Sequence, residues 1–183
     1  MSKVLVISGH PDLNDSVSNK IILAELEKEE NVTVEYLDAM YPEFAIDVPA
    51  EQAKLVEADV VVFQFPLFWY SAPSMLHRWM EQTFQHGFSH GSKGKALVGK
   101  KVVVSVTAGA PEEIYTVEQS GHVIDDYLFF IQGACALTGM EYAGTVFTGG
   151  VSYQMRTDPE QLAVIEEKSR AHADKLKALL ATL

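Results

Sequence analysis

Three aromatic residues, Phe68, Trp69 and Tyr70, follow one another in a segment with a proline on each side. The prolines break regular structure, so the sequence predicts a loop here, directly after the apolar run that ends at Phe65. Adjacent large aromatic side chains cannot all turn into one core, and their exposure to water is unfavourable. A flat, conjugated ligand lying against them would cover this surface, and a hydrophobic lid or a subunit contact would do so equally well.

A second segment of chemical interest, residues 9–19, follows the first apolar run of the chain. It lacks both the dinucleotide fingerprint G-x-G-x-x-G and the P-loop G-x-x-x-x-G-K-[ST]. It offers Ser16, Ser18 and Asn19 at a predicted helix start, where free backbone N–H groups and the helix dipole favour an anion. A helix cap made by Ser16 alone is the alternative, and the two aspartates of the loop oppose an anion unless they point away.

The third segment is Thr107-Ala108-Gly109-Ala110, after the apolar run Val102–Val106. Its small residues would let the backbone approach a ligand closely, although an ordinary strand-to-helix turn has the same composition. All three segments follow predicted strands. Because ligands of open α/β sheets bind at the carboxyl ends of the strands, we expect the three loops to converge there.

The elements that must position these loops alternate along the whole chain. Continuous apolar runs predict central strands that are buried on both faces, whereas the alternating run 32–36 predicts an edge strand. The predicted strands are Val4–Ile7, Val32–Tyr36, Val60–Phe63, Val102–Val106 and Ala143–Thr148. The predicted helices are Ser16–Glu30, Ala50–Glu57, Pro73–Phe84, Gln119–Leu137 and Asp158–Leu180. This pattern predicts a flavodoxin-like three-layer α/β sandwich around a five-stranded parallel sheet of order 2-1-3-4-5.

Composition narrows the class of protein. The 183 residues, 48% of them hydrophobic, fit one domain spanning 1–183. A net charge of −11 argues against nucleic acid or an anionic membrane surface as a direct partner. No apolar run is long enough for a signal peptide or a membrane span, so we expect a cytoplasmic protein without direct membrane insertion. The single cysteine, Cys135, excludes an internal disulfide and is expected in the core.

Two histidines, His86 and His90, have a spacing that would place two metal ligands on one helix face. The glycines at 87 and 91 indicate a loop instead, and no third ligand is evident. The sequence therefore predicts no metal site.

Together these segments resemble the flavodoxin-fold NAD(P)H:quinone oxidoreductase family. The matching patterns are Gly9-His10-Pro11 with Ser16 and Asn19, Pro66-Leu67-Phe68-Trp69-Tyr70 with Pro73, and Thr107 with Gly109. Within the family, the sequence is most similar to the ancillary proteins of bacterial glutathione-gated potassium efflux systems. Further matches lie at 41–47, 84–91 and 97–100, and the likeness runs from residue 4 to about residue 149.

The resemblance implies a non-covalent flavin: FMN, with FAD as the alternative. The phosphate and ribityl chain would be surrounded by His10, Ser16, Val17, Ser18 and Asn19. The isoalloxazine would lie along Pro66, Leu67, Phe68, Trp69 and Tyr70, with its pyrimidine edge at Thr107, Ala108, Gly109 and Ala110. Ala108 and Ala110 depart from the longer glycine run that relatives often carry.

The same resemblance implies an enzyme that transfers hydride from NADH or NADPH through FMN to a quinone in a two-electron ping-pong reaction. Tyr115 and His122 would handle protons, at a spacing one residue longer than the tyrosine–histidine pair of larger relatives. A surface tyrosine and a loop histidine are the alternative interpretation of this pair.

The family also implies a homodimer with the active site at the subunit interface. A second function is implied as well, that of a regulatory ancillary subunit. In that role the chain would bind and activate the cytoplasmic domain of a potassium–proton antiporter, at the periphery of the inner membrane.

Overall fold

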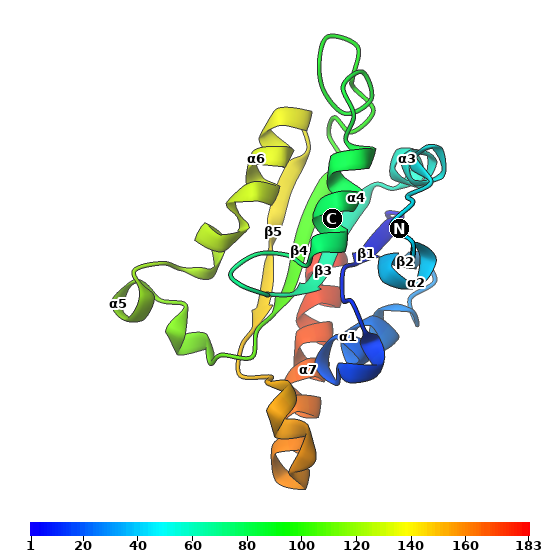
Figure 1. Ribbon diagram of the computed structural model, residues 1–183. Coiled ribbons are helices and arrows are strands. Elements are labelled where there is room, and N and C mark those ends of the chain that lie inside the picture. The colour runs from blue at the N-terminus through cyan, green and yellow to red at the C-terminus, as the bar shows by residue number, and fades with distance from the viewer.

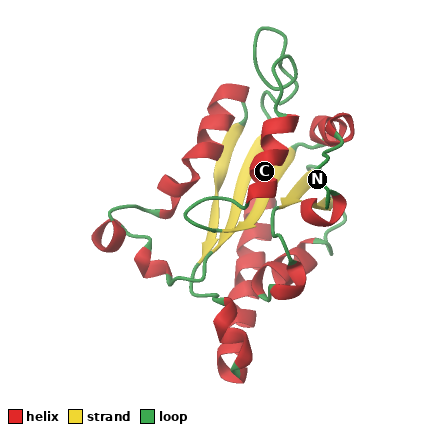
Figure 2. Cartoon of the chain, viewed as in Figure 1, coloured by secondary structure: helices red, strands yellow, loops and turns green.

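The computed structural model describes residues 1–183 and contains one parallel sheet in the order β2-β1-β3-β4-β5 (Figures 1 and 2). The strands are β1 Val4–Ser8, β2 Val32–Tyr36, β3 Val60–Pro66, β4 Lys101–Thr107 and β5 Glu141–Thr148. β1, β3 and nearly all of β4 are buried, whereas β2 is half-exposed at one edge. The predicted strand order and the predicted edge strand are both confirmed.

Seven α-helices and four short 3₁₀ segments connect the strands. The helices are α1 Ser18–Leu26, α2 Leu37–Met40, α3 Val48–Glu57, α4 Ser74–Thr83, α5 Val117–Ser120, α6 Phe129–Thr138 and α7 Pro159–Leu180. The 3₁₀ segments are η1 Leu13–Asp15, η2 Glu112–Ile114, η3 Ile124–Leu128 and η4 Tyr153–Thr157. Asp158 caps α7, because its carboxylate accepts from the N–H groups of Glu160 and Gln161. No helix combines the length and the apolar character needed to cross a bilayer.

The predicted continuous helix Gln119–Leu137 is wrong. The chain is instead divided there into α5, η3 and α6, and α5 projects from the side of the molecule (Figure 1). Gly121 ends α5 in a left-handed conformation, with φ of +78°. The backbone N–H of Val123 then donates to the Asp126 carboxylate at 2.9 Å, which starts the next turn. A glycine that terminates a helix outweighed the apolar pattern.

Alternate strand side chains enter two separate cores. Leu5 and Ile7 of β1 point toward α3, α4 and α6, whereas Val4 and Val6 point toward α1 and α7. The sheet therefore lies between two helical layers, which is the predicted three-layer sandwich. Cys135 lies in the first core, as predicted, and burial raises the pKa of its thiol to about 11, so it stays protonated.

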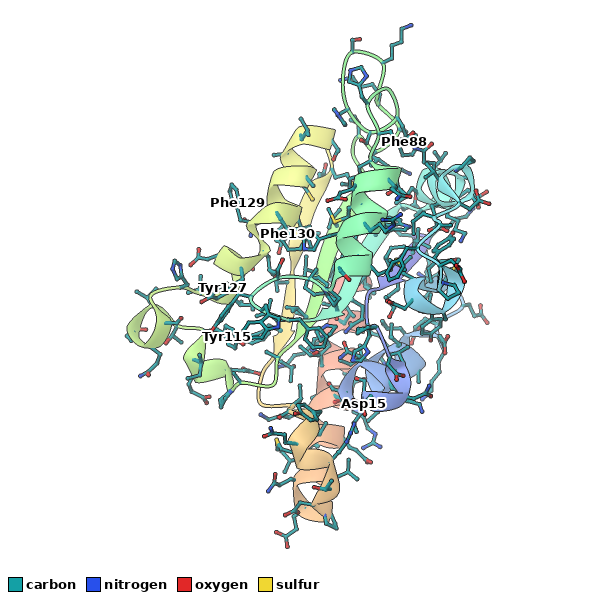
Figure 3. All side chains as sticks on the ribbon, viewed as in Figure 1. Asp15, Phe88, Tyr115, Tyr127, Phe129 and Phe130 are labelled. Carbon is teal, nitrogen blue, oxygen red and sulfur yellow. The ribbon has the colours of Figure 1, made fainter.

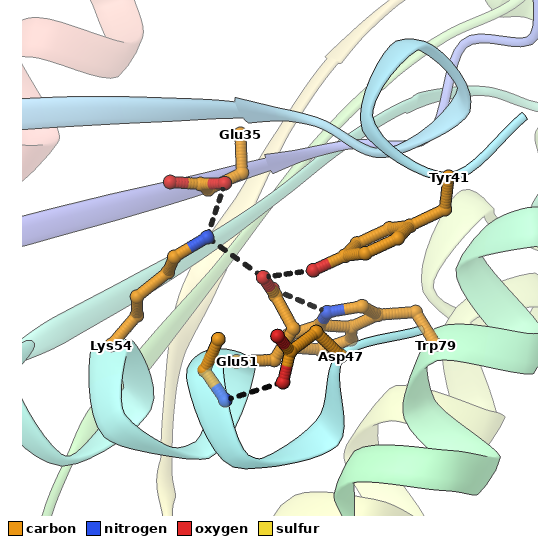
Figure 4. Close-up of polar contacts among 7 residues, drawn as sticks. Glu35, Tyr41, Asp47, Glu51, Lys54 and Trp79 are labelled. Carbon is orange, nitrogen blue, oxygen red and sulfur yellow. Dashed lines mark hydrogen bonds and ion pairs between the residues drawn. The ribbon is translucent and has the colours of Figure 1, made fainter. Parts of the chain in front are cut away.

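A charged cluster lies within the first helical layer (Figure 4). The fully buried Glu51 of α3 accepts hydrogen bonds from the Tyr41 hydroxyl and the Trp79 indole N–H, each at 2.7 Å. Lys54 Nζ lies 2.7 Å from carboxylate oxygens of both Glu51 and Glu35. The cluster joins β2, α3 and α4, and it supplies the partners that a buried carboxylate requires.

A buried histidine of α7 gives the fold a pH dependence. Burial lowers the pKa of His172 from 6.5 to about 4, and Lys175 adds to the effect. Between these values the unfolded chain binds a proton that the folded chain does not, so stability must fall as the pH falls. We expect a loss of about 3 kcal/mol by pH 4 from this group alone.

Urea denaturation of the wild type and of His172→Gln, between pH 7 and pH 4.5, tests this expectation. The stability advantage of the wild type should shrink as the pH falls, because the variant has no titrating group at this position. An advantage that stays constant across the range would contradict the assignment.

Candidate functional site

A cavity of about 280 Å³ opens at the carboxyl edge of the sheet. Its lining residues are His10, Asp15, Ser16, Val17, Ser18, Asn19, Pro66, Leu67, Phe68, Thr107, Ala108, Gly109, Val151, Ser152, Tyr153 and Ile165. Residues from all three predicted loops therefore meet in one place. A wider, more open hollow of about 700 Å³ lies at the opposite edge, but parallel α/β sheets bind ligands at the carboxyl edge.

The start of α1 forms a donor-rich wall of the cavity. The backbone N–H groups of Val17 and Ser18 donate to no acceptor in the chain. The Ser16 hydroxyl accepts from the backbone N–H of Asn19 at 3.2 Å, so it caps the helix and also faces the cavity. Free N–H groups at the positive end of a helix dipole favour an anion, although no lysine or arginine lines the cavity.

The two aspartates of this loop are occupied by contacts within the chain. The Asp12 carboxylate accepts from the N–H of Asn14 at 2.9 Å and caps η1. The Asp15 carboxylate forms an ion pair with Arg156, whose Nη1 also donates to the Asp15 carbonyl at 3.0 Å. Arg156 therefore offsets the acidic charge at the rim of the cavity.

His10 is held as a neutral hydrogen-bond donor. Its Nδ1 accepts from the backbone N–H of Asp12 at 3.2 Å, so the neutral ring carries its proton on Nε2. Burial lowers the pKa of His10, and the nearby Asp12 and Asp15 oppose this effect. The ring lies edge-on to Phe68, with centroids 6.2 Å apart, and both side chains line the cavity.

The aromatic loop is a tight turn that presents its side chains to solvent. Phe68 and Ser71 exchange backbone hydrogen bonds of 2.9 and 3.0 Å. Trp69 and Tyr70, between them, adopt φ of +51° and +63°, which is strained for residues other than glycine. Phe68 lines the cavity, whereas Trp69 is 96% and Tyr70 61% exposed just outside it. The backbone therefore holds two large apolar rings in water at a cost in strain.

The third loop contributes two further backbone donors. The N–H groups of Gly109 and Ala110 donate to no acceptor in the chain. Thr107, Ala108 and Gly109 line the cavity, and Ala110 follows directly beyond it. Such a pair of N–H groups can bind a carbonyl or anionic oxygen of a ligand.

Tyr115 and His122 lie outside the cavity lining, in an aromatic cluster beside the second loop. The Tyr115 ring packs edge-on against Tyr127 and Phe147, at centroid distances of 5.9 and 5.1 Å (Figure 3). Tyr127 also stacks on Tyr70 at 5.3 Å and lies 5.8 Å from the His122 ring. Tyr127 thus links both residues to the tip of the aromatic loop.

The two residues differ in their surroundings. Burial raises the pKa of Tyr115, and Tyr70 and Tyr127 add to the effect, so the phenol stays protonated at neutral pH. His122 is largely exposed, with its Nδ1 3.4 Å from a carboxylate oxygen of Asp126.

Sequence reasoning missed a fourth loop, which follows β5. It contributes Val151, Ser152 and Tyr153 to the cavity. Two further lining residues, Asp15 of the first loop and Ile165 of α7, were also not predicted as site residues. The N–H groups of residues 150 and 151 donate to carbonyls of the third loop at 2.7 and 3.1 Å. The pair Gly149-Gly150 was the available signal, because it marks a loop at the carboxyl end of a fifth parallel strand.

No group of three or more histidine, cysteine, aspartate or glutamate side chains is arranged to hold a metal ion. His86 and His90 lie in the loop between α4 and β4, with their rings 5.5 Å apart. The loop conformation at these histidines agrees with the prediction from the adjacent glycines.

Comparison with known proteins places this geometry in context. A family model described as a flavodoxin-like fold matches residues 2–173. General stress protein 14 of Bacillus subtilis is 40% identical over 157 residues, which cover 85% of this chain and 90% of that protein. The glutathione-regulated potassium-efflux system ancillary protein KefG of Salmonella agona is 37% identical over 163 residues, covering 88% of this chain and 87% of that protein.

Solved structures agree with this assignment. General stress protein 14 from Treponema denticola, in complex with FMN, superposes with a TM-score of 0.86 at 29% identity, covering 97% of this chain and 99% of that one. A putative quinone reductase from Klebsiella pneumoniae gives 0.72 at 27% identity, covering 98% of this chain and 85% of that one. By its sequence, sheet order and family match, the chain belongs to the flavodoxin-like NAD(P)H:quinone oxidoreductase family.

Proposed function

We propose that the chain binds FMN without a covalent bond and is an NAD(P)H:quinone oxidoreductase. One observation carries the proposal. The cavity at the carboxyl edge joins a helix start with free N–H donors to an apolar wall formed by the aromatic loop. This combination suits a ligand with an anionic phosphate at one end and a flat ring at the other. Two similar structures support the choice of FMN and of a quinone substrate: the Treponema denticola protein is in complex with FMN, and the Klebsiella pneumoniae protein is described as a putative quinone reductase.

Each wall is assigned one part of the cofactor. The phosphate and ribityl chain would be held by His10, Ser16, Val17, Ser18 and Asn19. The ring would lie against Pro66, Leu67, Phe68, Trp69 and Tyr70, with its pyrimidine edge near Thr107, Ala108, Gly109 and Ala110. No ammonium or guanidinium group lines the cavity, so uncharged donors would bind the phosphate.

When bound, FMN would supply the hydride chemistry, in two half-reactions that use NADH or NADPH and then a quinone in the same place. The N–H groups of Gly109 and Ala110 would stabilise negative charge on the pyrimidine oxygen. Tyr115 and His122 would deliver the protons that quinone reduction requires.

Titration of the purified protein with FMN tests the proposal. We expect one FMN per chain, with quenched flavin fluorescence and a shifted absorption spectrum. A parallel titration with FAD decides between the two flavins. A colourless preparation whose spectra respond to neither flavin would overturn the proposal.

A homodimer is a second expected property. Several large apolar side chains are exposed, among them Trp69 at 96% and Phe129 at 73%. Phe129 points away from the sheet, whereas Phe130 turns toward α4 (Figure 3). Burial of such a ring against a second copy should contribute about 1.5–3 kcal/mol per side chain.

Light scattering at micromolar concentration should report twice the mass of one chain. The variant Phe129→Glu should shift the protein toward monomer, and Glu167→Gln on α7 is the matched surface control. A flavin-bound wild type that scatters as a monomer would rule out the dimer.

The similarity to KefG supports an additional role as a regulatory ancillary subunit of a potassium–proton antiporter. Rapid oxidation of NADH or NADPH with a soluble quinone would favour the enzyme. Weak turnover combined with co-purification with an antiporter would favour the regulatory subunit.

A further inference from the structure

A row of buried polar side chains crosses the molecule from α7 toward the cavity. His172 on α7 lies with Nε2 2.7 Å from Ser105 Oγ and with Nδ1 2.9 Å from Thr148 Oγ1. The Ser105 hydroxyl in turn donates to Gln64 Oε1. His172, Ser105 and Gln64 are fully buried, and none of them lines the cavity. They belong to three different elements, α7, β4 and β3.

The row continues to the cavity wall. Gln64 Nε2 donates to Asn19 Oδ1 at 2.7 Å. Asn19 Nδ2 then donates to Thr107 Oγ1 at 3.0 Å and to Ser16 Oγ at 3.3 Å. Ser16, Asn19 and Thr107 line the cavity, so the polar row ends there.

With the amide groups of Gln64 and Asn19 oriented as above, counting hydrogens gives one direction along the row. The Ser105 hydroxyl has a single hydrogen, which it gives to Gln64, so it must accept from His172 Nε2–H. His172 Nδ1 is then an acceptor and takes the hydrogen of Thr148. Burial lowers the pKa of His172, which keeps the ring neutral, as this pattern requires. Every member therefore donates toward the cavity.

We propose that this polarised row holds two hydroxyls as hydrogen-bond donors toward a bound FMN: that of Ser16 toward the phosphate, and that of Thr107 toward the pyrimidine edge of the ring. Each of the two hydroxyls accepts from Asn19, which leaves its own hydrogen free to point into the cavity. His172, Ser105 and Gln64 touch no ligand and act as positioning residues. The inference rests on the proposed binding of FMN.

The opposite direction would satisfy the same atoms with the two amides turned over. The hydroxyls of Ser16 and Thr107 would then donate to Asn19 and present only lone pairs to the cavity. Lone pairs repel a phosphate oxygen, and the cavity has no lysine or arginine to compensate. The direction of the row therefore determines whether the Ser16 hydroxyl attracts or repels the phosphate beside the free N–H groups of Val17 and Ser18.

The histidine tautomer reports the direction without any ligand. In ¹⁵N NMR spectra of the wild type at neutral pH, we expect His172 to be neutral with its proton on Nε2. A neutral ring with the proton on Nδ1 would overturn the inference. The variant His172→Gln assigns the resonance among the six histidines.

Ligand discrimination tests the consequence, because riboflavin lacks the phosphate of FMN. Ser105→Ala removes the hydroxyl that joins His172 to Gln64 and so interrupts the row. FMN affinity should then fall on the order of five- to tenfold, the equivalent of one hydrogen bond. Riboflavin affinity should stay within about twofold of the wild type. Tyr41→Phe is the matched control, because it removes a buried hydrogen bond in the other core and should leave the FMN-to-riboflavin ratio unchanged.

Equal losses for FMN and riboflavin, or an unchanged FMN affinity, would overturn the inference. Failure of the wild type to bind either ligand would instead overturn the proposed function, and the tautomer measurement would still report the direction of the row. Should Ser105→Ala fail to fold, Thr148→Val breaks the row at its far end and carries the same expectation.

Discussion

Glu51→Leu is expected to lower the free energy of unfolding by about 3–5 kcal/mol. The carboxylate is fully buried and accepts from the Tyr41 hydroxyl, the Trp79 indole and the Lys54 ammonium (Figure 4). Leucine would leave two buried donors without an acceptor, each at a cost of about 1–3 kcal/mol. It would also remove one of the two carboxylates that Lys54 bridges.

Urea denaturation followed by circular dichroism measures this loss. Glu57→Leu, an exposed substitution on the same helix, is the matched control and should change stability by less than about 0.5 kcal/mol. A loss below about 1 kcal/mol for Glu51→Leu would mean that the two buried donors find other partners, and that the cluster contributes little to stability.

Apolar patterning was enough to predict the sheet. Strands such as Val102–Val106 are buried on both faces, so their sequence is almost entirely apolar, and the alternating 32–36 segment is typical of an edge strand. The loops at the carboxyl ends then followed from the sheet order, which is why most of the cavity wall could be foreseen.

Two kinds of feature could not be read from the pattern. Gly121 adopts a left-handed conformation and ends α5, although the residues after it retain helical character. The polar row is invisible in sequence, because Gln64 and Ser105 lie within apolar strands and Asn19 meets Thr107 across 88 positions. A lone polar residue in a buried strand is ordinarily a packing detail, and only the folded chain shows that several of them are connected.

Tyr115→Phe and His122→Ala are expected to slow the oxidative half-reaction, in which a quinone is reduced, roughly 10²-fold each, with flavin affinity nearly unchanged. Both side chains contact Tyr127, which stacks on Tyr70 at the tip of the aromatic loop. They therefore stand beside the open side of the proposed ring site, without lining the cavity that would hold the cofactor.

The pH dependence distinguishes a chemical role from a packing role. The raised pKa of Tyr115 keeps its proton available at neutral pH, and His122 lies with its Nδ1 3.4 Å from a carboxylate oxygen of Asp126. If the two residues are general acids, stopped-flow rates of quinone reduction should fall and change their pH profile. If they only shape the pocket, the Michaelis constant should rise while turnover stays largely intact.

Tyr127→Phe is the matched control, because it keeps the stacked ring and removes only a hydroxyl that has no assigned role. It should leave the oxidative rate within about twofold of the wild type. The spacing of Tyr115 and His122 is one residue longer than in larger relatives. Unchanged rates across the pH range in both Tyr115→Phe and His122→Ala would show that this longer spacing keeps the pair away from the quinone. The protons for quinone reduction would then come from water.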